Sequence, residues 1–257
     1  MSDKKVMFKV RNLTKEFKIR GKKIGEKPQI LHALSDVSVD IYEGETLGVI
    51  GESGCGKSTF GKCLVQLHKA TAGSVEYEGR NIFELKGNDL KKLKRDIQMV
   101  FQDPFSSLDP RMTAGQLVEE PMIVHKIVTD KAERKKRALE LLQTVGLNVQ
   151  HVHRYPHEFS GGQRQRINIA RALSLTPKLI VCDEPVSALD VSIQAQVLNL
   201  FNQLQRQYHL TYVFISHDLS VIKHISDRIA IMYLGRIVEL CDADIIYENP
   251  LHPYTKA

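Results

Sequence analysis

The segment GESGCGKST, residues 51–59, constrains the fold of this chain more than any other part. The short apolar run of residues 47–50 precedes it and is typical of a buried parallel strand. From Lys57 onward the pattern predicts a helix whose charged and polar side faces outward. A strand, a glycine-rich loop and a helix in this order are the context that the spacing G-x-x-x-x-G-K-[ST] requires.

The residue types of this loop predict phosphate binding. Glycine lets the backbone take positive φ and approach an anion without a Cβ in the way. Successive N–H groups and the N-terminus of the helix attract negative charge. Lys57 would contact the β- and γ-phosphates, and the Ser58 hydroxyl would ligate Mg²⁺. A chance glycine loop is the alternative, and the strand–helix context disfavours it. The predicted nucleotide-binding residues are Gly51, Glu52, Ser53, Gly54, Cys55, Gly56, Lys57, Ser58 and Thr59.

The composition is that of an ordinary globular protein. The chain has 257 residues, 42% hydrophobic and 26% charged, which suits one large α/β domain or two small ones. No apolar run approaches the roughly 20 residues that span a bilayer, and the N-terminus lacks a secretory h-region. The net charge of +6 is spread over separate segments, so a solvated surface is favoured over a nucleic-acid groove. The four cysteines lack C-x-x-C spacing, which predicts free thiols in a reducing cytosol.

Hydrophobic patterns along the chain predict an α/β fold. We expect a P-loop NTPase core with a parallel sheet, an N-terminal antiparallel β region and an inserted helical subdomain at roughly residues 109–160. Asp130 and Glu133 predict a helix start in capping-box style, and Gly146 predicts its end. All of this is assigned to one domain, residues 1–257. Strands are predicted at residues 6–10, 37–41, 74–77, 97–101, 179–182 and 211–215, with a hairpin at 230–240.

Candidate catalytic residues follow predicted strands. Asp183 and Glu184 end a buried apolar run, and His217 follows the next strand, where ligands bind in doubly wound sheets. Asp183 is predicted to hold Mg²⁺, and Glu184 to orient the attacking water as general base. Alternatively, Asp183 and Glu184 are a pair of solvated carboxylates at the end of a strand. His217 is either a structural histidine or a contact to the γ-phosphate. Gln102 carries an amide that could meet Mg²⁺ or the attacking water.

Two further features have both a functional and a structural interpretation. Ser160, Gly161 and Gly162 precede a helix that begins near Gln163, a second helix start suited to an anion. The alternative is a glycine turn capped by serine. Phe17 is an aromatic residue in a polar segment, and it is either an edge-strand residue packed on the sheet or a platform for an adenine ring.

The ordered set GESGCGKST, VFQDP, FSGGQRQR, LIVCDEP, SALD and FISHD resembles the ATP-binding subunit of ABC transporters, from about residue 8 to residue 257. QDPFSSLDPRM and NPLHPYTKA resemble the oligopeptide/dipeptide importer branch. The resemblance implies that Phe17 stacks on adenine, that His217 holds the γ-phosphate, and that Gln102 touches Mg²⁺ and couples to membrane subunits. It also implies a dimer interface at Asp190 and contacts to the partner's γ-phosphate from Ser160, Gly161, Gly162 and Gln163.

The resemblance further implies an ATP hydrolase with ATP and Mg²⁺ as cofactors, whose subunits close head to tail on ATP. It would sit on the cytoplasmic face of the membrane, bound to two membrane-spanning permease subunits, with an extracytoplasmic solute-binding protein acting indirectly and no nucleic acid. Import of another solute such as nickel, a soluble ABC protein acting on ribosomes or DNA, and a scaffold without turnover are the alternatives. The solute, and whether the ATPase partner is identical or a sister chain, stay open.

One departure concerns the C-terminus. Peptide-importer ATPases usually continue past HPYT into a tail that often bears clustered cysteines, whereas this sequence stops at Ala257. We therefore expect no iron–sulfur cluster in it, and removal of a tail after Ala257 is left open.

Overall fold

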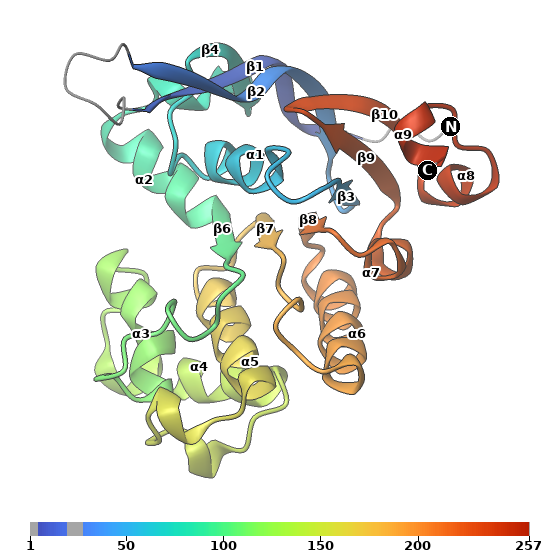
Figure 1. Ribbon diagram of the computed structural model, residues 1–257. Helices are drawn as coiled ribbons and strands as arrows, with labels where there is room; N and C mark the ends of the chain where they lie inside the picture. The colour runs from blue at the N-terminus through green and yellow to red at the C-terminus, as the bar shows by residue number, and fades with distance from the viewer. Residues whose placement is uncertain (1–4, 20–27, 257) are drawn as a thin grey trace. The chain divides into compact units, whose positions relative to one another are not determined.

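The computed structural model describes residues 5–19 and 28–256, and the chain forms two compact units. The first unit comprises the described parts of residues 1–90 and 212–257, and the second comprises residues 91–211. Figure 1 labels their helices and strands. The assignment of residues 1–257 to a single domain stays a prediction.

An antiparallel sheet forms the outer part of the first unit, as predicted. Inward-facing Phe8 and Val10 are fully buried while Lys9 between them is exposed, the alternation of a sheet with one covered face. α1 (Lys57–Leu64) lies beside β2 (Figure 1). The sequence GKKIGEKPQ, residues 21–29, is rich in Gly, Pro and Lys and predicts a loop between the first two strands, and it falls mostly outside the described residues. The strands run in the order β2-β1-β4-β5 and are β1 (Val6–Ile19), β2 (Gln29–Tyr42), β4 (Ala72–Tyr77) and β5 (Arg80–Asn81).

A second set of strands in the first unit supports the glycine-rich loop. Every residue of β3 (Thr46–Ile50) and β8 (Thr211–Ser216) is buried, which confirms the predicted buried strand before the loop. β3 pairs in parallel with both β8 and β9 (Arg228–Tyr233). β9 and β10 (Arg236–Asp242) form the predicted hairpin. Three short helices of this unit were not predicted from the sequence: α7 (Leu219–Ile225), α8 (Ala243–Glu248) and α9 (Pro253–Lys256).

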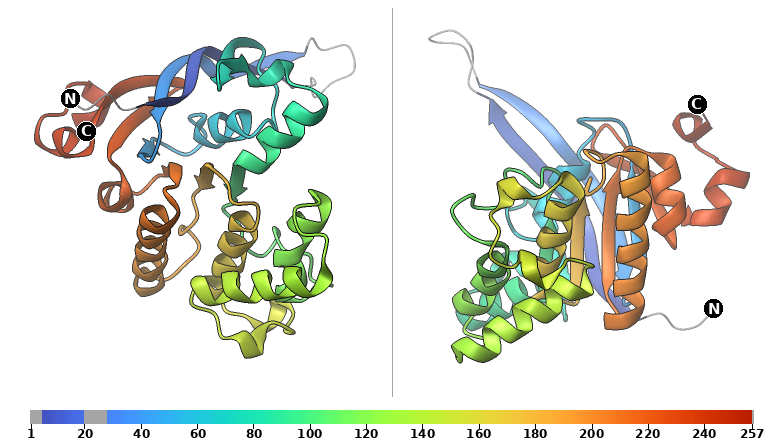
Figure 2. Two further views of the ribbon diagram at one scale, coloured as in Figure 1. Left: turned by 180° about the vertical axis from the view of Figure 1, so that it is seen from behind. Right: turned by 90° about the horizontal axis from the view of Figure 1, so that it is seen from below.

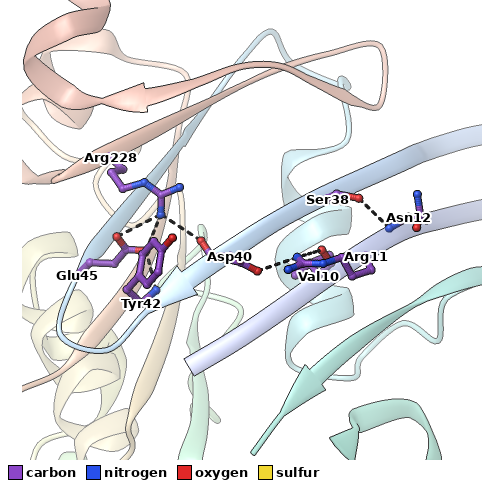
Figure 3. Close-up of polar contacts among 8 residues, drawn as sticks. All are labelled: Val10, Arg11, Asn12, Ser38, Asp40, Tyr42, Glu45 and Arg228. Atoms are coloured by element: carbon purple, nitrogen blue, oxygen red, sulfur yellow. Dashed lines mark hydrogen bonds and ion pairs between the residues drawn. The ribbon is translucent and has the colours of Figure 1, made fainter. Parts of the chain in front are cut away.

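A polar cluster fixes the antiparallel sheet against β9 (Figure 3). Arg228 donates to the backbone oxygen of Asp40 at 3.1 Å and to Glu45 Oε1 at 3.1 Å, and its guanidinium lies 4.9 Å from the Tyr42 ring centroid. The Asp40 carboxylate pairs with Arg11 at 2.7 Å. Glu45 is only 2% exposed, so removing Arg228 would take its charged partner from a buried carboxylate that otherwise accepts from the Tyr42 N–H at 2.8 Å; breaking a buried ion pair in this way typically costs about 3–5 kcal/mol.

The second unit holds two parallel strands and the helical region (Figure 2). α3, α4 and α5 pack together, which confirms the predicted helical subdomain and adds α5 to it. α4 starts and ends at the predicted residues: Asp130 Oδ1 accepts from the Glu133 N–H at 2.7 Å, and Gly146 has φ of 78°. Among the hydrogen bonds of the described residues, the Glu133 side chain does not return the bond, so the cap is the aspartate half of a capping box. α2 (Gly87–Asp96) begins in the first unit and was not predicted. The other elements of the second unit are β6 (Ile97–Val100), α3 (Ala114–Val124), α4 (Lys131–Thr144), α5 (Gly161–Leu173), β7 (Leu179–Asp183) and α6 (Val191–Tyr208).

Short 3₁₀ turns complete the two units, at Ile82–Glu84 in the first and at Val149–His151 and Pro156–Glu158 in the second. Within the described residues, none of the helices combines the length and the apolar character needed to cross a bilayer. The four cysteines all lie in the described part of the chain and are free thiols, as predicted.

Candidate active site

The glycine-rich loop connects β3 to α1 and approaches its neighbours so closely that side chains are excluded. A Cβ on Gly51 would lie 2.1 Å from the backbone oxygen of Met232. Gly56 has φ of 112°, and its Cβ would lie 2.3 Å from the backbone oxygen of Ala33. Both positions therefore require glycine. Glu52, Ser53 and Gly54 form the exposed rim of the loop, and Cys55 is buried beneath it.

Lys57 closes the loop from inside. Its side chain is only 4% exposed, and Nζ donates to the backbone oxygens of Gly51 at 2.5 Å and Glu52 at 2.8 Å. Ser58 and Thr59 follow on the first turn of α1 and are half-buried. The predicted loop residues therefore form one continuous strand–loop–helix, with the ammonium group held across it.

His217 leaves the sheet beside this loop. β3 and β8 pair in parallel with Ile50 opposite Ser216, so Gly51 and His217 follow paired positions at the same edge. The His217 side chain is exposed. The next residue, Asp218, caps α7 by accepting from the Ser220 N–H at 2.8 Å, which fixes the turn that carries His217. His217 therefore leaves the sheet at the same edge as the phosphate loop, and its catalytic role stays a prediction.

Phe17 lies near the end of β1, in the first unit. β4 pairs with β1 only as far as Thr14, so Phe17 has a strand neighbour on one side alone. Its half-buried ring meets His68 edge-on at 5.3 Å between centroids, and Lys15 Nζ lies 4.9 Å from the ring centroid. The edge-strand interpretation describes these contacts, and adenine stacking stays a prediction.

In the second unit, the predicted amide and acid are in contact. β6 and β7 pair in parallel with Val100 opposite Cys182, so the residues after both strands leave the same edge. Gln102 Nε2 donates to Glu184 Oε2 at 3.0 Å. Asp183 is 4% exposed, and Glu184 has φ of 47°, a backbone conformation that non-glycine residues take rarely and often at functional sites.

Three side chains of α5 hold the segment that follows Gln102. Asn168 Nδ2 donates to Ser107 Oγ at 2.8 Å, and Arg171 donates to the Ser107 backbone oxygen at 3.0 Å. The Arg164 guanidinium lies 4.0 Å from the Phe105 ring centroid. The sequence analysis did not identify these three positions. Their spacing along one helix face was the available signal, because residues at i, i+4 and i+7 lie on the same side.

The start of α5 combines a serine cap with two glycines. Ser160 Oγ accepts from the Gln163 N–H at 3.4 Å, and Gln163 Oε1 accepts from the Ser160 N–H at 3.0 Å. A Cβ on Gly162 would lie 2.4 Å from Cγ2 of Ile193, whereas one on Gly161 would lie 3.3 Å from Cδ2 of Leu189. The serine-capped turn expected as the structural alternative is therefore present. A contact with a partner's phosphate stays a proposal.

Asp190 lies at the start of α6, and its side chain is exposed. Its backbone oxygen accepts from the N–H groups of Ile193 and Gln194 at 2.9 and 2.8 Å, so the backbone that carries the side chain is fixed. This is compatible with an interface position and does not test it.

Comparisons with known proteins identify the family. The family model described as ABC transporter matches residues 34–187. The chain is 58% identical over 226 residues to the oligopeptide transport ATP-binding protein OppF of Bacillus subtilis (strain 168), covering 88% of this chain and 74% of that protein. It is 50% identical over 259 residues to the dipeptide transport ATP-binding protein DppF of Lactococcus lactis subsp. cremoris (strain MG1363), covering 100% and 81%.

A solved structure agrees with this. The ATP-binding cassette MJ0796, in a dimeric post-hydrolysis state bound to ADP and Pi, superimposes with a TM-score of 0.81 at 34% identity, covering 92% of this chain and 99% of that one. The fold and these comparisons identify an ATP-binding cassette with ATPase activity. The chain belongs to the ABC transporter family, which confirms the resemblance found in the sequence.

Proposed function

We propose that this chain is the ATPase subunit of an importer for oligopeptides or dipeptides. The observation that carries the proposal is the identity of 50–58% with transport ATP-binding proteins of that description, over most of the chain. The intact Lys57, Glu184 and His217 support turnover rather than a scaffold role.

For hydrolysis, Glu184 polarises the attacking water, and the 3.0 Å contact with Gln102 supports this by fixing the direction of its carboxylate. Lys57 and the loop N–H groups hold the β- and γ-phosphates. His217 contacts the γ-phosphate, and Phe17 stacks on adenine. Mg²⁺ would neutralise charge on the phosphates. Ser58, Gln102 and Asp183 would hold this ion, because their side chains offer the hard oxygen donors that Mg²⁺ prefers.

ATP binding closes two such subunits head to tail, and hydrolysis releases them. The support is that MJ0796, 34% identical to this chain, is described as dimeric with ADP and Pi bound. In this arrangement Ser160, Gly161, Gly162 and Gln163 contact the γ-phosphate held by the partner, and Asp190 lies at the interface. The partner is an identical chain or a sister ATPase.

The membrane-spanning subunits bind the second unit close to the Gln102 segment. A groove there is lined by Met112, which precedes α3, and by residues of α3 and α4, including Ile123 and Val124. The side chains of Ile123 and Val124 are 51% and 69% exposed, although both are apolar. Exposed apolar residues beside charged ones suit a protein interface. The subunit would work at the cytoplasmic face of the membrane, with a solute-binding protein on the opposite side.

Reconstitution tests this proposal. The chain is purified with two permeases and, where it does not pair with itself, a sister ATPase of the same transporter, and the complex is placed in proteoliposomes with the transporter's solute-binding protein. We expect ATP-dependent uptake of a labelled tripeptide. A complex in which every copy of this chain carries Glu184→Gln should take up no tripeptide. Uptake of nickel without uptake of peptide would reassign the solute. Absence of any transport by a complex that hydrolyses ATP would contradict an importer role.

A further inference from the structure

Gln165, in α5, carries a buried amide that has no role in the hydrolysis steps proposed for this chain. Gln165 is 0% exposed, and among the residues that the structure describes neither its Nε2 nor its Oε1 has a hydrogen-bond partner. Most buried polar side chains are paired, because an unpaired buried amide has lost its bonds to water and gained none. A buried amide that is unpaired in one conformation is therefore a candidate for pairing in another.

The turn of α5 before Gln165 packs on the segment that joins Glu184 to α6. A Cβ on Gly161 would lie 3.3 Å from Cδ2 of Leu189, which belongs to this segment. Residues four apart are neighbours on one face of a helix, so Gly161 and Gln165 share this face. Helical side chains lean toward the N-terminus of their helix, which directs the Gln165 amide toward this turn. The amide therefore lies on the side of α5 that meets the segment after Glu184.

The turn of α5 after Gln165 binds the segment that follows Gln102. Asn168 Nδ2 donates to Ser107 Oγ at 2.8 Å, and Asn168 lies three residues after Gln165, on the same side of the helix. The two segments start from one contact, because Gln102 Nε2 donates to Glu184 Oε2 at 3.0 Å. Along α5, Gln165 therefore lies between the contacts with the two segments that carry the amide and the acid.

The chemistry of the side chain suits a bridge between two backbone segments. A glutamine amide has two N–H donors and a carbonyl oxygen that accepts, so it can bond to a C=O of one segment and an N–H of the other. A group that is unpaired in one conformation and paired in another shifts the equilibrium toward the second. A bridging Gln165 would thus favour one arrangement of Gln102 and Glu184.

We propose that Gln165 is a positioning residue for ATP hydrolysis, whose amide bridges the segments after Gln102 and Glu184 when ATP is bound. It acts on the attacking water only through Glu184. The proposal rests on the general-base role proposed for Glu184, and it is independent of which solute is transported.

Gln165→Met in the full chain, with the sister ATPase where the chain does not pair with itself, tests the proposal. Methionine has a similar length but cannot form the hydrogen bonds of an amide. Without nucleotide, the melting temperature should rise by about 2–4 °C, because the variant no longer buries an unpaired amide. At saturating Mg-ATP, kcat should fall roughly three- to tenfold, the effect of losing about one hydrogen bond. The Kd for ATP should stay within about twofold, because residues 51–59 are unchanged.

Ile169→Met is the matched control. Ile169 is fully buried and lies one turn after Gln165 on the same face of α5. The control introduces the same methionine but removes no amide, so kcat should stay within about twofold of wild type and the melting temperature should not rise. Gln165→Leu repeats the test with a second apolar side chain, and its result decides if methionine packs poorly at this position.

The opposite results would overturn the proposal. A fall in melting temperature in both Gln165→Met and Gln165→Leu, or failure of both to fold, would show that the amide is already paired without nucleotide. A rise in melting temperature with an unchanged kcat would reduce Gln165 to an unused polar group. Glu184→Gln in the same series separates two failures. If it hydrolyses ATP like wild type, the general-base assignment is wrong, whereas a slow Glu184→Gln beside a fast Gln165→Met contradicts the role of Gln165 alone.

Discussion

Two helices in the described part of the chain, α1 and α5, begin at glycine-rich turns, and their caps differ. α1 begins after Gly56, which is in the left-handed region and provides no side chain to cap the helix. α5 begins after Ser160, which forms a capping box with Gln163. The first N–H groups of any helix lack partners inside the helix. At α1 these groups can turn to a ligand, whereas at α5 one of them is already satisfied by the serine.

The two starts also differ in charge. Lys57 lies across the first loop, with Nζ bonded to the loop's own carbonyl oxygens. At the second start, the side chains nearest to a Cβ built on Gly161 or Gly162 are the apolar Leu189 and Ile193. The first start has N–H groups and the ammonium group of Lys57, so it can bind a phosphate by itself. The second start offers a few N–H groups in a closely packed turn. This supports the proposal that the second start completes a site on another subunit.

The largest expected effect is at the second start. Gly161→Asp places a carboxylate where the partner's γ-phosphate is proposed to lie, and like charges at close range repel. We expect ATP hydrolysis to fall about a hundredfold or more, consistent with loss of several kcal/mol of transition-state stabilisation. The Kd for ATP at the variant's own loop should not change. Gly161→Asn, of similar size but neutral, is the matched control and should retain more activity.

A mixing experiment sharpens this prediction if identical chains pair. Gly161→Asp and Lys57→Ala proteins, each inactive alone, would form a mixed dimer with one site carrying both defects and one carrying neither. Some hydrolysis should return. No recovery despite demonstrated mixed dimers would argue against an independently working shared site. If the chain does not pair with itself, the Gly161→Asp variant is studied with the sister ATPase.

At the first start, Lys57→Ala should weaken ATP binding. A hydrogen bond to a charged group contributes about 1.5–3 kcal/mol, so the Kd should rise roughly 10- to 150-fold. Lys62→Ala, in the last turn of α1, is the matched control and should bind ATP like wild type. Calorimetry measures both. A Kd that changes in Gly161→Asp but not in Lys57→Ala would reverse the assignment of the two helix starts.

Glu184→Gln should slow the chemical step of hydrolysis and leave the phosphate contacts of both helix starts unchanged. The amide keeps the shape of the side chain but cannot take a proton from water, so hydrolysis should be at least about tenfold slower. Binding of Mg-ATP should stay normal, because neither start is altered. Single-turnover kinetics with matched binding measurements would test this, and an unchanged rate would move the general-base role to another residue.

The sequence predicted features set by neighbouring residues and missed those set by distant contacts. The strand before Gly51, the cap of α4 at Asp130 and the β9–β10 turn at Gly235 depend on local residue types, and all were predicted. α2 was missed because its sequence is rich in lysine and Leu93 is its one buried residue, so it lacks the apolar stripe that predicts a helix. Arg228 donates to Glu45 and to the backbone of Asp40, which lie more than 180 residues earlier in the chain, and no local pattern predicts this contact.

The smallest expected effects compare the two glycines of the second start. Gly162→Ala would place a Cβ 2.4 Å from Cγ2 of Ile193, and such overpacking typically costs about 1–3 kcal/mol. Alanine regains about 1 kcal/mol of helix propensity, so we expect a net loss of up to about 2 kcal/mol in the free energy of unfolding. Gly161→Ala meets Leu189 at 3.3 Å, where a small side-chain shift makes room, so stability should change by about 0.5 kcal/mol or less.

Urea unfolding of both variants measures this difference, and ATP hydrolysis measured beside it separates packing from function. If Gly161 serves only the turn, Gly161→Ala should hydrolyse ATP like wild type. If its N–H faces a partner's phosphate, the added methyl group lies at that contact, and hydrolysis should fall while stability does not. A loss of stability at Gly161 as large as at Gly162 would show that the second start is a packing element alone.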